Sequence, residues 1–284
     1  MKGGYFLFNG RFHKEDEAVF TLADLSCRAN GFSEAFRAEH NEVLFLEEVS
    51  RHLLATAESF DLDMDGLLDP DGRLLRKDVS RLLNKNKLYI SAKIEVQIYP
   101  ALNGTNILLH AEELERGYYP LREPGLLLSF YHDHLKGDQP IPSYASSSSL
   151  MELGARRKAS GIQKPNMILL NRERNCIESI GGSFAFLNNR VVTFPSADSG
   201  GYRCAILNQV MKSVKDAGYS PVEKDKITME ELLDSEELFL FDACNGLQKV
   251  LGLEDNRYFS TNTPRIAAKL SELAKKDREE RINN

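Results

Sequence analysis

The chain is 284 residues long; 42% of its residues are hydrophobic, 27% are charged, and its formal net charge is −6 at pH 7. These fractions are ordinary for a folded globular protein, and they exclude a disordered chain, a collagen-like chain and a coiled coil. The acidic balance, with basic residues scattered along the chain, argues against nucleic acid as a partner. No apolar run approaches the roughly 18 residues that a membrane-spanning helix needs.

The cysteines and the N-terminus indicate the cellular compartment. Cys27, Cys176, Cys204 and Cys244 are far apart and include no C-x-x-C pair. We therefore interpret them as reduced residues rather than as disulfides or zinc ligands. The first twelve residues lack the apolar core and the cleavage site of a secretory signal. Together these observations predict a cytoplasmic protein.

The N-terminal part of the chain combines strands with helices. Asn9-Gly10 separates two apolar-rich runs, which is typical of a β-hairpin. Between residues 47 and 62 the apolar side chains recur every three or four positions, which predicts an amphipathic helix. Residues 79–83 are predicted to be helical as well. Strands are predicted at residues 5–8, 11–13, 36–45, 87–98 and 106–110.

Residues 116–125 are the expected boundary between two domains. The segment reads RGYYPLREPG and is rich in residues that interrupt regular structure. We therefore predict a smaller α+β N-terminal domain at 1–116, a linker at 117–125 and a larger mixed α/β domain at 126–284.

The C-terminal part alternates strands with helices. Gly218 follows the best-formed helical pattern and is expected to end it. Strands are predicted at residues 126–130, 167–170, 184–187, 191–194 and 237–241, and helices at residues 151–159, 204–217 and 265–276.

Two polar motifs in this half could bind a ligand. Glu178 precedes a loop of small residues, 179–183, where glycines let a ligand approach the backbone. Residues 199–203 (SGGYR) precede a predicted helix, whose first amides could hold an anion. A plain turn or an ordinary helix start would use the same residues. His132 and His134 could also bind a metal, but no third ligand stands at a recognised spacing, and we predict no metal site.

Eight segments form a longer pattern when they are taken in chain order. They are residues 6–10 (FLFNG), 24–34 (DLSCRANGFSE), 48–57 (EVSRHLLATA), 178–186 (ESIGGSFAF), 191–195 (VVTFP), 200–203 (GGYR), 236–239 (EELF) and 244–247 (CNGL). Their order and spacing resemble the class IV fold of pyridoxal-phosphate enzymes. That family contains branched-chain and D-amino-acid aminotransferases and 4-amino-4-deoxychorismate lyase. The segment 244–247 is most similar to the lyase branch.

The resemblance implies a two-domain fold of the α+β or α/β class, with pyridoxal 5′-phosphate as cofactor. The family's carboxylate that pairs with the cofactor's ring nitrogen falls on Glu178, where it would keep the ring protonated as an electron sink. The cofactor phosphate would lie on the amides of Gly201 and Tyr202. The family's phosphate-binding arginine falls on His52, which offers a single donor where a guanidinium offers a bidentate fork.

The catalytic lysine departs furthest from the family pattern. The family needs a lysine to form the Schiff base and to move the proton at the substrate α-carbon. The resemblance puts it near Tyr144 or Ala145, in the segment PSYAS, which contains no lysine. Lys136 is the nearest lysine upstream, and it is a candidate only if the alignment slips by eight or nine residues. Ser183 also replaces an asparagine of the family.

Two functions follow from the resemblance. The first is an active pyridoxal-phosphate-dependent aminotransferase or 4-amino-4-deoxychorismate lyase with an unconventional base, acting on an amino acid or on aminodeoxychorismate. The second, which we favour, is a family member with a degenerate cofactor site that binds another small-molecule ligand or a partner. We favour it because the lysine, arginine and asparagine positions have all changed, and all three would serve the same cofactor. In the family a second subunit completes the site, so the resemblance also implies a homodimer.

Overall fold

The computed structural model describes residues 4–17, 19–21, 27, 30–137, 149–162, 164 and 166–283. The chain forms two compact units: unit 1 comprises Met1–Tyr118 and Ala274–Asn284, and unit 2 comprises Tyr119–Leu273. The division after Tyr118 falls within the predicted linker 117–125. The last residues of the chain, which the sequence assigned to the C-terminal domain, group with unit 1 instead, because the long helix α7 (Thr263–Asn283) begins in one unit and ends in the other.

Unit 1 contains an antiparallel sheet of six strands in the order β2-β1-β6-β5-β3-β4. Asn9 and Gly10 form the turn between β1 and β2 with φ angles of 47° and 75°. A two-residue hairpin turn of type I′ has positive φ at both central residues, so the predicted hairpin is confirmed. The strands are β1 (Tyr5–Phe8), β2 (Arg11–Lys14), β3 (Phe32–Glu39), β4 (Glu42–Val43), β5 (Ser91–Pro100) and β6 (Thr105–Glu113).

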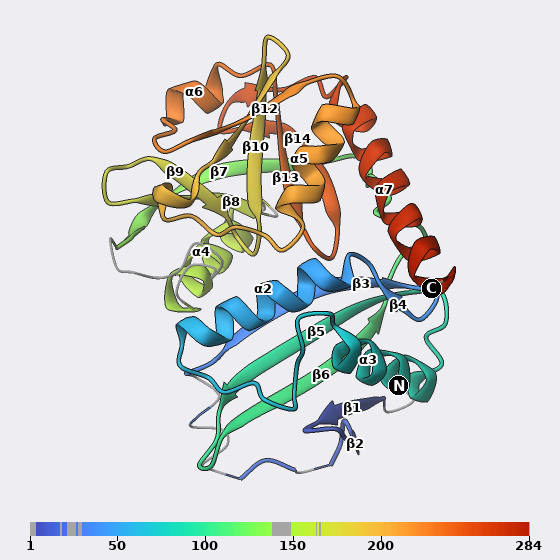
Figure 1. Ribbon diagram of the computed structural model, residues 1–284. Helices are drawn as coiled ribbons and strands as arrows, with labels where there is room; N and C mark the ends of the chain where they lie inside the picture. Colours follow the sequence, from blue (N-terminus) through green and yellow to red (C-terminus); the bar gives the residue numbers. More distant parts are fainter. Residues whose placement is uncertain are drawn as a thin grey trace. The chain divides into compact units, whose positions relative to one another are not determined.

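Two helices, α2 (Leu46–Ser59) and α3 (Arg73–Asn86), cover one face of this sheet (Figure 1). The predicted amphipathic helix is confirmed, because α2 buries residues at three- and four-residue steps along its length. On β5, buried residues alternate with partly exposed ones, among them Glu95 and Gln97. Alternate strand residues point to opposite faces, so the other face of the sheet is polar at this point.

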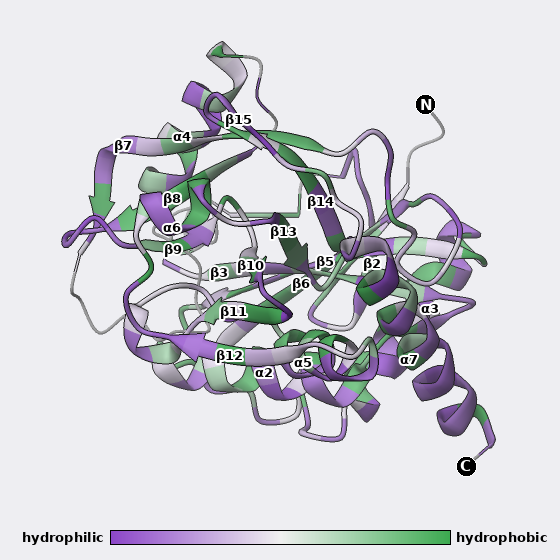
Figure 2. Ribbon diagram, turned by 90° about the horizontal axis from the view of Figure 1, so that it is seen from above, coloured by the Kyte–Doolittle hydropathy of each residue, from purple (hydrophilic) through white to green (hydrophobic). Residues whose placement is uncertain are grey.

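Unit 2 contains a mixed sheet of nine strands in the order β12-β11-β10-β13-β14-β7-β8-β9, with β15 paired to β14. The β11–β12, β14–β7 and β7–β8 pairs are parallel. Five consecutive residues of β13 are buried, which is expected of a strand covered on both faces, and Figure 2 shows β13 in the green of hydrophobic residues. The strands are β7 (Leu126–Lys136), β8 (Asn166–Asn171), β9 (Cys176–Ser179), β10 (Ser183–Asn188), β11 (Val191–Pro195), β12 (Ser220–Lys224), β13 (Glu237–Asp242), β14 (Gly246–Leu253) and β15 (Asn256–Arg257).

Strand β7 extends six residues beyond its predicted end at Phe130. Its pairing with β8 jumps from Tyr131–Leu169 to Lys136–Asn171, so five steps on β7 correspond to two steps on β8. The intervening residues, which include the exposed His132 and His134, form a bulge of several residues. Their polar sequence breaks the apolar pattern, which is why the pattern predicted too short a strand.

The three helices predicted in the C-terminal part are present with shifted ends, whereas the short helix α6 was not predicted. The helix predicted at 204–217 begins only at Leu207, and the strands β9, β12, β14 and β15 were not predicted. Among the described residues, no helix combines the length and the apolar character needed to cross a membrane. The remaining helices are α4 (Ser149–Gly161), α5 (Leu207–Asp216) and α6 (Met229–Leu233).

Candidate functional site

A buried ion pair between Lys136 and Glu178 lies at the centre of the candidate site in unit 2. The Nζ atom of Lys136 lies 3.0 Å from Oε2 of Glu178. Lys136 is 5% exposed and Glu178 is 1% exposed. Charged residues are almost never buried this deeply unless they are paired, so each residue supplies the compensation that the other needs.

The strand pairing explains how two residues 42 positions apart meet. β7, β8 and β9 are neighbours in the sheet (Figure 1). Lys136 pairs with Asn171 across the β7–β8 ladder, and Glu178 pairs with Leu169 across the β8–β9 ladder. Asn171 and Leu169 are two residues apart on β8 and therefore point to the same face. The long side chains of Lys136 and Glu178 meet diagonally across β8, because the bulge in β7 sets this register.

Glu178 has further hydrogen-bonding capacity. Its Oε2 atom also accepts a hydrogen bond of 2.6 Å from the backbone amide of Tyr202. Its Oε1 atom is buried and has no hydrogen-bond partner among the residues that the structure describes. A buried carboxylate oxygen without a donor is costly, so this atom is where a ligand with a hydrogen-bond donor would be stabilised.

The segment around Gly201 packs closely against the strand that carries Glu178. A Cβ atom added at Gly201 would lie 2.1 Å from the carbonyl oxygen of Ile177, so no other residue fits here without a backbone shift. The amide of Gly201 donates to Oγ of Ser199 at 3.2 Å. Together with the Tyr202–Glu178 bond, this means that both amides predicted to hold a phosphate are bonded to acceptors of the protein itself.

Ser183 has a positioning role that the sequence did not reveal. Its hydroxyl donates to the carbonyl of Tyr202 at 2.7 Å and accepts from the amide of Cys204 at 3.3 Å. It therefore fixes the backbone on both sides of Arg203. The available signal was a hydroxyl at the first residue of a largely apolar strand, because a buried hydroxyl must find partners.

The other predicted site residues lie elsewhere. His52 belongs to α2 in unit 1, where its Nε2 atom lies 3.3 Å from Oε1 of Glu34. Tyr144 and Ala145, at the expected lysine position, fall outside the described residues. In the β7 bulge, Asp133 forms an exposed ion pair with Lys158.

The arrangement around Glu178 matches part of what pyridoxal phosphate requires. The free Oε1 atom of Glu178 could accept a hydrogen bond from a protonated ring nitrogen. However, the Lys136 ammonium is already bound to this carboxylate, and a pyridinium would bring a second positive charge beside it. The amides of Gly201 and Tyr202 are occupied, and the Glu178 carboxylate next to Tyr202 would repel a phosphate. These residues do not fit the complete cofactor in this arrangement.

Solved structures with the same fold are found among pyridoxal-phosphate enzymes. A branched-chain aminotransferase from Thermoproteus uzoniensis with norvaline matches with a TM-score of 0.83 and 20% identity over 98% of this chain and 97% of that one. The branched-chain amino acid aminotransferase of Escherichia coli matches with a TM-score of 0.79 and 18% identity over 93% and 92%. A hypothetical aminotransferase from Mycobacterium tuberculosis in its PLP-bound form matches with a TM-score of 0.80 and 14% identity over 95% and 98%.

These matches confirm the predicted fold class, a two-sheet class IV aminotransferase fold. The solved neighbours include one structure with pyridoxamine 5′-phosphate and one in its PLP-bound form. No curated protein matches the chain. The family model for amino-transferase class IV matches residues 31–253, which is most of the sequence. The chain therefore belongs to the class IV aminotransferase family, as its sequence motifs predicted.

Proposed function

We propose that this chain is a class IV aminotransferase homologue with a degenerate cofactor site, in which Lys136 serves as the permanent counter-ion of Glu178. In this proposal the protein does not form the covalent lysine linkage of its family, and it binds a different small molecule. The observation that carries the proposal is the buried Lys136–Glu178 ion pair of 3.0 Å. The ammonium neutralises the charge of the carboxylate that the family offers to the cofactor ring.

Two further features support the proposal. The segment between Lys136 and Lys158 contains no lysine, so the family's lysine position has no occupant that could form the linkage. The amides of Gly201 and Tyr202 are committed to Ser199 and Glu178. The missing lysine removes the interaction with the cofactor's aldehyde, and the committed amides remove the interaction with its phosphate.

The experiment is reductive trapping of the full-length protein with pyridoxal phosphate. Purified protein is incubated with a stoichiometric amount of the cofactor and reduced with borohydride, and the modified lysines are identified by peptide mass mapping. We expect no modification at Lys136. We also expect the visible absorbance of the wild type with the cofactor to equal that of the Lys136→Ala variant. The Lys158→Ala variant, which changes an exposed lysine, serves as the matched control for surface labelling.

Stoichiometric trapping of the cofactor on Lys136 would overturn the proposal. It would establish the second candidate function, an active pyridoxal-phosphate enzyme with Lys136 as its covalent lysine. One observation favours this candidate: Lys136 is buried against the carboxylate that the family directs at the ring nitrogen. It requires the ammonium to leave Glu178 so that the ring can enter between the two side chains.

For the assembly we propose the homodimer that the family resemblance implies, in the cytoplasm. All four cysteines are free thiols, which supports a reducing compartment.

A further inference from the structure

Unit 1 contains an open cavity whose lining residues all belong to that unit. Its volume is about 250 Å³, just below the usual range of ligand pockets. Two strands form its floor. Glu95 of β5 pairs with His110 of β6, and Gln97 pairs with Leu108. Directly paired residues of an antiparallel ladder share a face, so these four side chains line the cavity together. The alternation on β5 and a strand at residues 106–110 were both predicted from the sequence, but the register that pairs Glu95 with His110 was not.

The polar side of the cavity consists mainly of hydrogen-bond acceptors. Gln97 donates through Nε2 to Glu95 at 3.4 Å, and its buried Oε1 atom has no partner among the described residues. Glu15 lies on the segment that follows β2, and its Oε1 atom lies 2.9 Å from Nε2 of His110. Each carboxylate oxygen can accept two hydrogen bonds. The side chains therefore leave acceptor capacity for a ligand that brings donors.

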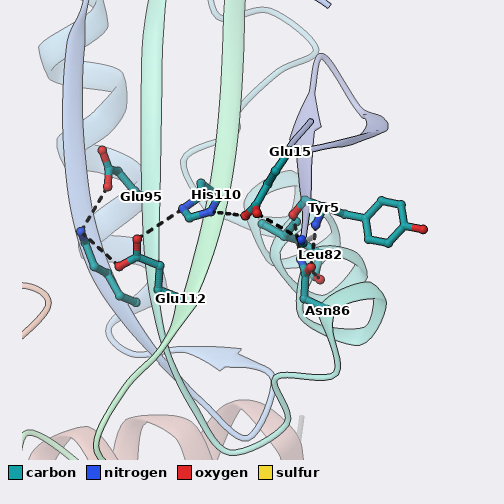
Figure 3. Close-up of polar contacts among 9 residues, drawn as sticks. Tyr5, Glu15, Leu82, Asn86, Glu95, His110 and Glu112 are labelled. Atoms are coloured by element: carbon teal, nitrogen blue, oxygen red, sulfur yellow. Dashed lines mark hydrogen bonds and ion pairs between the residues drawn. The ribbon is translucent and has the colours of Figure 1, made fainter. Parts of the chain in front are cut away.

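The charges around the cavity have a negative balance. Lys93 binds Glu95 at 3.1 Å and lies 3.9 Å from Glu112, which in turn lies 3.9 Å from Nδ1 of His110. Figure 3 shows this chain of contacts running from Glu95 through Glu112 and His110 to Glu15. It contains three carboxylates, one ammonium and one imidazole. A cation entering the cavity would reduce the excess of negative charge.

The carboxylates that line the cavity stay ionised at neutral pH. The hydrogen bonds from His110 and from the Gly4 amide lower the pKa of Glu15. Burial tends to raise the pKa of Glu95, but the interactions with Lys93 and Gln97 outweigh it and leave that pKa below its ordinary value.

The apolar side of the cavity is formed by aromatic rings. Phe6 and Phe20 both line it. Their ring centroids are 5.9 Å apart and their planes are inclined by 18°. Aromatic faces attract cations and also accept apolar groups. A ligand with a positively charged end and an apolar body would match both sides of the cavity.

We propose that this cavity binds a small organic ammonium ion. Its N–H groups donate to Glu15 and Glu95, and its apolar body packs against Phe6 and Phe20; Gln97 holds the Glu95 carboxylate through its Nε2 atom. The inference is independent of the proposed function, because all of these residues belong to unit 1 and Lys136 and Glu178 belong to unit 2.

Benzylamine is the probe for the test, and benzyl alcohol and benzoate are its neutral and anionic counterparts. Isothermal titration calorimetry on the full-length chain measures the affinities, and amide chemical shifts of Glu95 and His110 locate the binding. We expect saturable binding of benzylamine only, and a loss of about tenfold or more in Glu15→Gln, because a hydrogen bond to a charged group is removed. Gln97→Leu should weaken binding as well.

Glu113→Gln makes the same charge change as Glu15→Gln at an exposed position of β6 outside the cavity, and it should bind like the wild type.

Glu15 is about half exposed, so Glu15→Gln should fold normally. The proposal is overturned if benzylamine does not bind or does not shift the Glu95 and His110 signals. Equal affinities for benzyl alcohol or benzoate, or unchanged benzylamine binding in both Glu15→Gln and Gln97→Leu, would overturn it as well.

Discussion

The free-energy cost of burying Lys136 or Glu178 depends on the residues around each of them. Burying either charge alone costs several kcal/mol, and the pair repays this cost only when its geometry is good. Here the ammonium lies 3.0 Å from the carboxylate, which also accepts the Tyr202 amide. The pair is therefore a structural element of unit 2 as well as the candidate site.

We predict strong energetic coupling between Lys136 and Glu178. Lys136→Met and Glu178→Gln should each lower the free energy of unfolding by about 3–5 kcal/mol, because each leaves an uncompensated buried charge. The double variant should be much more stable than the sum of the two losses implies. Urea unfolding of the four proteins gives the coupling energy.

The exposed pair Asp133–Lys158, which connects β7 to α4, provides the control for this cycle. Its coupling in Asp133→Asn and Lys158→Met should stay at about 0–1 kcal/mol, as for other surface ion pairs. Strictly additive losses at Lys136 and Glu178 would contradict the assignment of a structural ion pair.

At the scale of elements, Glu237 connects β13 to the start of α7. One of its oxygens accepts from the amides of Thr261 and Asn262, and the other accepts from the amide and hydroxyl of Thr263. Glu237 is 2% exposed. Burial tends to raise the pKa of Glu237, but the hydrogen bonds from Thr263, Asn262 and Thr261 outweigh it and hold that pKa below its ordinary value.

The lowered pKa of Glu237 predicts a pH-dependent stability. Because the folded state binds the proton less tightly than the unfolded state, the stabilisation is complete above the unfolded pKa of about 4.5. It is lost as the pH falls through the lower folded value. Glu237→Gln should therefore lower the free energy of unfolding at pH 7 by about 3 kcal/mol and flatten its dependence on pH below 5.

Denaturant unfolding between pH 3 and pH 7 measures this effect. Glu236→Gln, which alters the exposed neighbouring carboxylate, should keep the slope of the wild type. An unchanged slope in Glu237→Gln would show that other groups cause the acid sensitivity.

At the scale of the whole molecule, the chain begins and ends in unit 1. The last turns of α7 bind the junction between β4 and α2: Asp277 accepts from the amide of Phe45 at 3.0 Å, and Arg281 donates to the carbonyl of Val43 at 2.6 Å. Phe45 has a positive φ of 52° just before α2 begins, which is an unfavourable conformation for a bulky residue. The C-terminus therefore stabilises a strained connection more than 200 residues upstream.

We predict that Asp277→Ala weakens this junction. The loss of the bond to the Phe45 amide should lower the free energy of unfolding by about 1–2 kcal/mol and speed amide hydrogen exchange in the first turn of α2. Glu279→Ala, which changes an exposed residue of the same helix, is the control. Unchanged exchange at α2 in Asp277→Ala would contradict the role given to the C-terminal turns.

Much of the fold could be predicted because its signals are local. The Asn9-Gly10 hairpin follows from the φ angles that this dipeptide tolerates, and α2 follows from the spacing of its apolar residues. The site was less predictable. Glu178, Gly201 and Tyr202 were named from motifs, but the partners of their polar atoms depend on contacts between strands distant in sequence. The strand β7 was predicted too short because the polar bulge interrupts its pattern.

The sequence by itself determined the family and the absence of a lysine at the expected position, because both depend only on the order of residue types. The tertiary structure alone decided that Lys136 reaches Glu178, since this contact requires the shift in register across the β7 bulge. It also decided that α7 ends in unit 1 and that β5 and β6 form the floor of an open cavity. Local patterns fix which face of an element is buried, whereas pairings between distant residues depend on strand register and packing.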